Sequence, residues 1–137
     1  MDRVTDYTPR GVDAPSNTVL VVDDDASIRL LCRLNLQFDG MAVREAATIA
    51  QAREQLGGGG IDVVVLDVHV GSGSGVDFLT EIRREYPQLK VAMLTGSVGS
   101  PALDDVAADA FIPKPFTIEQ LTDTVASLAP RVARKAG

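Results

Sequence analysis

The chain has 137 residues, a single cysteine and a formal net charge of −6. A chain of this length can bury a full core as one domain, and its lone Cys32, expected as a small core residue, excludes an intrachain disulfide. The negative charge argues against direct nucleic-acid binding, because that affinity comes mainly from Lys and Arg contacts to phosphate. No apolar stretch approaches the roughly 18–20 residues of a membrane span and no signal-peptide pattern opens the chain, so we expect a cytoplasmic protein.

Strand-like and helix-like segments alternate along most of the chain. Residues 1–17 lack periodicity, so we expect a flexible N-terminal extension before a domain at 18–130 and a short basic tail at 131–137. β-branched and aliphatic runs predict strands at 19–23, 41–46, 61–66, 91–94 and 110–112. Helical spacing of apolar residues predicts helices at 26–38, 48–56, 76–86, 100–108 and 117–128.

The starts of several helices carry capping signals. Thr48 with Gln51 and Thr117 with Gln120 have the spacing of a capping box, in which each side chain satisfies the other residue's backbone amide. Asp25 directly precedes the first helical run, so we favour it as an N-cap over a metal ligand. One face of this first helix is expected to carry Ile28, Leu31, Asn35 and Phe38.

Five strand and helix pairs indicate a doubly wound α/β fold, with a five-stranded parallel sheet and five helices. The carboxyl ends of parallel strands lie at one edge of the sheet, where open α/β folds bind ligands. Polar residues end four of the apolar runs, namely Asp23 with Asp24, Asp67, Thr95 and Lys114. The sequence therefore predicts a ligand site at this edge.

The three acids suggest which ligand. Two carboxylates at ~4 Å repel by ~1 kcal/mol in water and ~4 kcal/mol at an effective dielectric near 20, so Asp23, Asp24 and Asp67 are unfavourable together without a cation. Oxygen ligands without paired His or Cys favour Mg²⁺, and Mn²⁺ also fits. A carboxylate beside such a cation can attack phosphorus, with Thr95 as a hydroxyl donor and Lys114 as a fixed ammonium.

Four segments in this order resemble the response-regulator receiver domains. They are Val21-Val22-Asp23-Asp24-Asp25 with Ser27-Ile28-Arg29, then Leu66-Asp67 with Gly75 eight residues later, Met93-Leu94-Thr95-Gly96, and Phe111-Ile112-Pro113-Lys114-Pro115-Phe116. The resemblance covers nearly all of residues 18–129 and implies a flavodoxin-like (βα)5 fold.

The resemblance implies a phosphoacceptor and a metal site. Asp67 matches the phosphoacceptor, which takes a phosphoryl group from a phosphohistidine on a sensor histidine kinase or phosphotransfer protein. Asp24 matches the direct metal ligand and Asp23 its neighbour, which acts through water. Asp67 itself and the backbone carbonyl of His69 complete the ligands for Mg²⁺.

It also implies a switch and an output. Thr95 and Phe111 match a pair in which the hydroxyl turns toward the phosphoryl group and the ring moves inward, while Lys114 contacts the phosphoryl oxygens. We expect signalling to a partner protein from a monomer or a phosphorylation-linked dimer, without direct contact to nucleic acid or membrane. We expect no enzyme activity beyond self-catalysed phosphotransfer and dephosphorylation.

One departure from the family and two alternatives qualify this interpretation. Val70-Gly71 stands where many receivers have Met-Pro, so we expect a more flexible loop after Asp67. One alternative is a small phosphatase of the haloacid-dehalogenase type using Asp23, since Asp23-x-Asp25-x-Ser27 resembles its nucleophile motif, although Asp67 then has no role. The other alternative is a receiver that works by docking alone.

Overall fold

The computed structural model describes residues 16–96 and 107–130, which form a central parallel sheet flanked by helices. The sheet contains β1 (Thr18–Val22), β2 (Ala42–Ala46), β3 (Val63–Asp67), β6 (Lys90–Thr95) and β7 (Ala110–Pro113). The five strands lie in the order β2-β1-β3-β6-β7. The doubly wound five-stranded sheet predicted from the sequence is confirmed, with strand bounds that agree within two residues.

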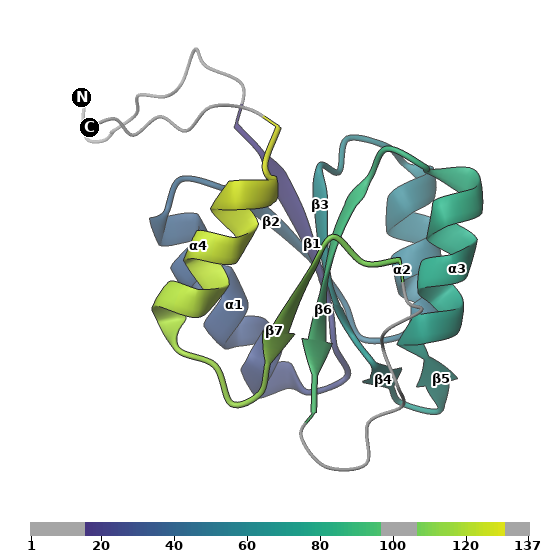
Figure 1. Ribbon diagram of the computed structural model, residues 1–137, viewed down its shortest axis with the longest axis horizontal. Coiled ribbons are helices and arrows are strands. Elements are labelled where there is room, and N and C mark those ends of the chain that lie inside the picture. Colours follow the sequence, from purple (N-terminus) through teal and green to yellow (C-terminus); the bar gives the residue numbers. More distant parts are fainter. Residues whose placement is uncertain (1–15, 97–106, 131–137) are drawn as a thin grey trace.

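Helices cover both faces of the sheet (Figure 1). The helices are α1 (Ala26–Phe38), α2 (Ile49–Gly57), α3 (Gly75–Glu85) and α4 (Ile118–Leu128). The pair α1 and α4 packs on one face, and the pair α2 and α3 packs on the other. The helix predicted at 100–108 falls almost wholly outside the described residues. No helix within the described ranges is long and apolar enough to cross a membrane.

The central strands divide their side chains between two cores. Along β1, Val19 and Val21 pack with α1 and α4, whereas Leu20 and Val22 pack with α2 and α3. This alternation follows from the two-residue period of a strand. Because both faces are covered, β1 and β3 are apolar along nearly their whole length, as is typical of parallel sheets.

The inward face of α1 differs from the sequence prediction. Cys32 and Leu36 are fully buried and Ile28 packs beside them, so the face at i, i+4 and i+8 points to the sheet. Leu31 and Phe38, predicted on one face with Ile28, are exposed, Phe38 by 93 %. The prediction was wrong because α1 carries apolar residues on more than one side, which spacing alone does not rank.

Side-chain caps begin all four described helices. Asp25 Oδ1 accepts hydrogen bonds from the amides of Ser27 and Ile28, which confirms Asp25 as the cap of α1. Thr117 and Gln120 form the reciprocal capping box predicted for α4. At α2, Thr48 accepts from the Gln51 amide as predicted, but the Gln51 side chain accepts from Ala47, one residue before the cap.

A short hairpin that the sequence did not predict follows the end of β3. Its strands are β4 (His69–Val70) and β5 (Gly73–Ser74), which pair antiparallel. Gly71 occupies the turn with φ +60°, a conformation that glycine adopts without steric cost. Part of the loop that the sequence predicts to be more flexible therefore forms a tight turn, and Ser74 then caps α3.

Candidate functional site

The structure places the predicted site residues at the carboxyl edge of the sheet. Asp23 and Asp24 follow β1, Asp67 ends β3, Thr95 ends β6 and Lys114 follows β7. Because β1, β3, β6 and β7 are neighbours in this order, the topology brings these five residues together from segments up to 91 residues apart.

Asp23 is held through every polar group it has. Its side chain is 1 % exposed. Its amide donates to the Ala46 carbonyl at 3.1 Å, and its own carbonyl accepts from Arg29 Nη1 at 2.8 Å. Oδ1 accepts from the Asp25 amide at 2.9 Å and Oδ2 from Lys114 at 3.3 Å. Asp23 is therefore fixed in place between β2, α1 and Lys114.

Lys114 joins two of the acids. Its ammonium lies 3.3 Å from Asp23 Oδ2 and 3.2 Å from Asp67 Oδ2. Burial alone would lower the pKa of Lys114, but the two carboxylates outweigh burial and raise that pKa. Lys114 is therefore a permanent cation at neutral pH, and its amide also donates to the Thr95 carbonyl at 2.7 Å.

Three carboxylates gather here, those of Asp23, Asp24 and Asp67, and the single ammonium of Lys114 pairs with two of them. Burial raises the pKa of Asp23, and the charge of Asp67 adds to this effect, although the Asp25 amide and Lys114 oppose it. One oxygen from each of Asp23, Asp24 and Asp67 can be chosen so that all lie within 4.8 Å of one another. This group of hard oxygen donors, with Asp24 exposed to solvent, fits a divalent cation that keeps part of its water shell. Asp25 does not join it, because its carboxylate caps α1.

Three further predicted residues surround this cluster. Thr95 is nearly buried at 8 % exposure, one residue beyond the Leu94 that pairs with Asp67. Phe111 on β7 is 42 % exposed and pairs with Met93. His69 begins the hairpin and is exposed, and no hydrogen bond or ion pair joins its imidazole to the three acids.

Gly75 is part of the sequence pattern shared with the family, and the structure shows why a glycine stands there. A Cβ at this position would lie 1.9 Å from the Asp67 carbonyl oxygen, so no other residue fits without a backbone shift. The Gly75 amide also donates to the Val68 carbonyl at 2.6 Å. Gly75 thus lets the start of α3 pack against the backbone of Asp67. In the sequence, the signal for this close packing was a glycine directly before a predicted helix.

Comparisons with known proteins show which family the chain is similar to. The sequence model of one protein family, the response regulator receiver domain, matches residues 19–126. The sensor kinase CckA of Brucella abortus is 36 % identical over 115 residues, covering 80 % of this chain and 12 % of that protein. The probable transcriptional regulatory protein TcrX of Mycobacterium tuberculosis is 36 % identical over 122 residues, covering 82 % of this chain and 49 % of that protein. The chain therefore spans half or less of the length of these curated relatives.

Solved structures show the same fold. The chemotaxis protein CheY4 of Vibrio cholerae superposes with a TM-score of 0.76 at 29 % identity, covering 83 % of this chain and 99 % of that one. A response regulator from Thermotoga maritima superposes with a TM-score of 0.71 at 30 % identity, covering 83 % of this chain and 98 % of that one.

Proposed function

The chain belongs to the family of response-regulator receiver domains, and on this premise we propose that Asp67 accepts a phosphoryl group in a Mg²⁺-dependent step. The observation that carries the proposal is the arrangement of Lys114, whose ammonium contacts the carboxylates of Asp67 and Asp23 at 3.2 and 3.3 Å. Asp24 adds the third acid of the cation site. The proposed nucleophile, the acids of the cation site and the ammonium thus lie together at one edge of the sheet.

The chemistry follows from these positions. Asp67 attacks the phosphorus of a phosphohistidine, so that a P–O bond forms, the P–N bond breaks and the leaving imidazole keeps the electron pair and takes up a proton. When bound, Mg²⁺ supplies positive charge beside both the attacking carboxylate and the phosphoryl oxygens. Lys114 then pairs with a phosphoryl oxygen, and the Thr95 hydroxyl donates to another. Asp23, Asp24 and Asp67, with the His69 carbonyl, would hold the cation.

The output is a shift between two arrangements of the site. Phosphorylation adds negative charge at Asp67, which favours the arrangement that brings the Thr95 hydroxyl close. Phe111, now 42 % exposed, moves inward in that arrangement. Carrying an equilibrium from 1:99 to 99:1 needs about 5.5 kcal/mol, which a few charge-assisted hydrogen bonds to the phosphoryl group can supply.

The partners follow from the same role. We propose that a sensor histidine kinase or a phosphotransfer protein donates the phosphoryl group, and that a second protein reads the altered surface. The domain itself binds no nucleic acid, consistent with its net charge of −6, and it acts as a monomer or a phosphorylation-linked dimer. Its catalysis is limited to its own phosphorylation and dephosphorylation.

The test uses acetyl phosphate with Mg²⁺ as the phosphodonor. Mass spectrometry of the intact protein should show one added phosphoryl group, lost in Asp67→Asn and in the presence of a chelator. Asp23→Asn keeps Asp67, so it should still be modified at raised Mg²⁺. Modification that maps to Asp23, or rapid turnover of small phosphate esters, would favour the phosphatase alternative. A protein that neither binds Mg²⁺ nor takes up phosphate would be a docking-only receiver.

A further inference from the structure

We propose that Arg29 is a positioning residue for the cation site, which it orders by holding the Asp23 backbone while Glu45 holds Arg29. The inference rests on the proposed function, since it concerns the same Mg²⁺ site. It assigns a task to residues that touch neither the cation nor the phosphoryl group.

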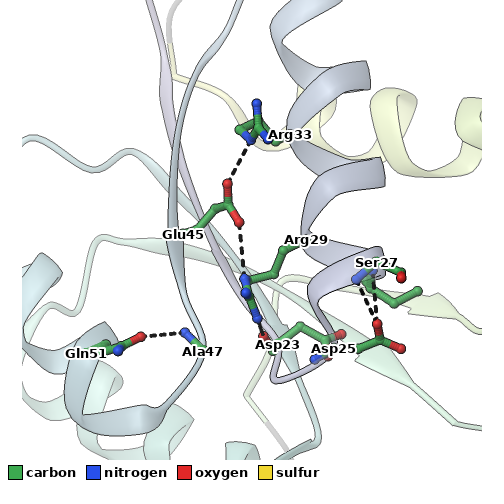
Figure 2. Close-up of polar contacts among 9 residues, drawn as sticks. Asp23, Asp25, Ser27, Arg29, Arg33, Glu45, Ala47 and Gln51 are labelled. Carbon is green, nitrogen blue, oxygen red and sulfur yellow. Dashed lines mark hydrogen bonds and ion pairs between the residues drawn. The ribbon is translucent and has the colours of Figure 1, made fainter.

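The contacts form a chain from the edge strand to the acids. Arg29 lies near the start of α1, and its Nη1 donates to the Asp23 carbonyl at 2.8 Å. Its Nε pairs with Glu45 Oε1 on β2 at 3.1 Å, and the Arg29 side chain is only 18 % exposed. Figure 2 shows Arg29 extending from Glu45 down to Asp23, with Arg33 on the far side of Glu45.

Asp23 needs this contact because the strand has ended. Parallel pairing of β1 with β2 stops at Val22 and Ala46, and the Asp23 amide makes the last bond, to the Ala46 carbonyl. The Asp23 carbonyl then lies between β1 and α1 and accepts from Arg29. That carbonyl belongs to the planar peptide that joins Asp23 to Asp24. Fixing its direction therefore fixes where the amide nitrogen and Cα of Asp24 lie, the atoms from which the Asp24 side chain extends.

Glu45 prevents Arg29 from leaving this position. A guanidinium can satisfy a carboxylate and a carbonyl together because its donors form a rigid planar fork. Glu45 uses its two oxygens for two arginines, Arg29 at 3.1 Å and Arg33 at 2.8 Å. Outer groups that orient metal ligands in this way typically change metal affinity about 10- to 100-fold when removed.

A simple bridge between α1 and β2 is the competing explanation, and Arg33 separates the two. Arg33 pairs with the same Glu45 from the next turn of α1, and its side chain bonds to Glu45 rather than to Asp23. Arg33→Ala therefore removes one α1–β2 bridge and one positive charge without releasing the Asp23 carbonyl. It is the matched control for Arg29→Ala.

The sign of the effect separates positioning from electrostatics. Arg29 carries a positive charge close to the acids, so deleting it would tighten Mg²⁺ binding if charge alone mattered. Loss of positioning works in the opposite direction. We therefore expect Arg29→Ala to weaken Mg²⁺ binding about 10-fold, while Arg33→Ala leaves it unchanged or slightly tighter. Arg29→Lys should fall between them, since an ammonium keeps the charge but cannot reproduce the fork.

The experiment is isothermal titration of the full chain with Mg²⁺ alone, for the natural sequence and the three variants. A thermal melt of each variant gives its stability, and the acetyl phosphate reaction is measured over a range of Mg²⁺. Arg29→Ala should need more Mg²⁺ for half its maximal rate but approach the natural rate at saturation. Should Arg29→Ala fail to fold, Arg29→Lys carries the test, because it keeps the charge, and a weaker Mg²⁺ affinity is expected.

Each outcome decides the matter. Unchanged or tighter Mg²⁺ binding in folded Arg29→Ala overturns the inference, as does an equal loss of affinity in Arg33→Ala. Either result leaves the proposed function standing, provided that the natural chain binds Mg²⁺ and is modified on Asp67. If the natural chain does neither, the proposed function fails and the inference fails with it.

Discussion

At the scale of single residues, Asp23 is a group whose charge the folded protein tolerates poorly in the absence of a cation. Burial raises its pKa, repulsion by Asp67 adds to this, and the Asp25 amide and Lys114 compensate only in part. A carboxyl whose pKa is higher in the folded than in the unfolded chain adds stability below the unfolded pKa. That stability is lost as pH rises through the folded pKa.

Asp23→Asn should therefore stabilise the metal-free protein at pH 7. Asparagine keeps the shape and an acceptor for the Asp25 amide but carries no charge in the buried position. We expect a higher Tm than that of the natural chain, with about 4 °C for each kcal/mol gained in a domain of this size. The gain should shrink as pH falls, because Asp23 itself then becomes protonated. Thermal melts in a chelating buffer at several pH values measure it.

Asp24→Asn is the control for this prediction. Asp24 is exposed and keeps its contact with water, so its neutralisation should change Tm much less. With Mg²⁺ present, both variants should lose the stabilisation that the cation gives the natural chain. A Tm of Asp23→Asn below that of the natural chain at pH 7 without metal would show that the Lys114 pairing outweighs desolvation.

At the scale of elements, the packing of α3 against β3 depends on Gly75. Alanine in a helix is usually favoured over glycine by about 1 kcal/mol. Here the added methyl carbon would lie 1.9 Å from the Asp67 carbonyl oxygen, so either α3 or β3 must move. We expect Gly75→Ala to lose about 1–3 kcal/mol of unfolding free energy, as overpacked sites do, and to slow phosphorylation of Asp67 by displacing its backbone. Urea unfolding and the acetyl phosphate rate measure the two effects.

Gly57→Ala provides the matched control. Gly57 is the last residue of α2, and a Cβ there would meet nothing within 4 Å. The same substitution should be neutral or stabilising by about 0.4–1 kcal/mol, because it reduces the freedom of the unfolded chain. Equal effects in the two variants would mean that the close approach at Gly75 does not matter.

The elements also show what the sequence could predict. The five strands, the doubly wound parallel sheet and the gathering of Asp23, Asp67 and Lys114 followed from apolar runs and parallel topology, because strand ends in such sheets share one edge. The order of the strands was not predicted. The side of α1 that faces the sheet could not be predicted, because apolar residues lie on more than one side of this helix. The hairpin after Asp67 was missed because glycine favours a tight turn and an irregular loop equally well. The contact of Arg29 with the Asp23 carbonyl depends on side-chain reach, which spacing does not encode.

The side of α1 that faces the sheet can be tested by substitutions. Leu36 is fully buried, so Leu36→Ala should cost about 2–5 kcal/mol of unfolding free energy. Leu34 is 52 % exposed and Phe38 93 % exposed, so Leu34→Ser and Phe38→Ser should each change stability by about 0.5 kcal/mol or less. Urea unfolding of the three variants measures this. A large loss of unfolding free energy in Phe38→Ser would show instead that Phe38 lies on the inward face, as the spacing predicted.

At the scale of the whole molecule, one thiol reports on the core that contains α1. Cys32 is fully buried between α1 and the sheet, where burial and the charge of Asp23 raise its pKa to about 12. A thiol reacts as its thiolate and only when it is accessible, so Cys32 should resist alkylation at pH 8 in the folded protein. Its reaction rate then measures how often this side of the sheet opens.

Mg²⁺ should slow the labelling of Cys32 if the domain opens as one unit. The acids proposed to bind the cation lie at the ends of β1 and β3, between the two cores, so an opening that exposes Cys32 and separates these strands should release Mg²⁺. A ligand bound only to the closed state lowers the open fraction by 1 + [Mg²⁺]/Kd, which is about 100-fold at 100 times Kd. Asp67→Asn should lose most of this protection, and Na⁺ at equal ionic strength should give none. Labelling that ignores Mg²⁺ in the natural chain would show instead that α1 opens locally while the strands that carry the acids stay together.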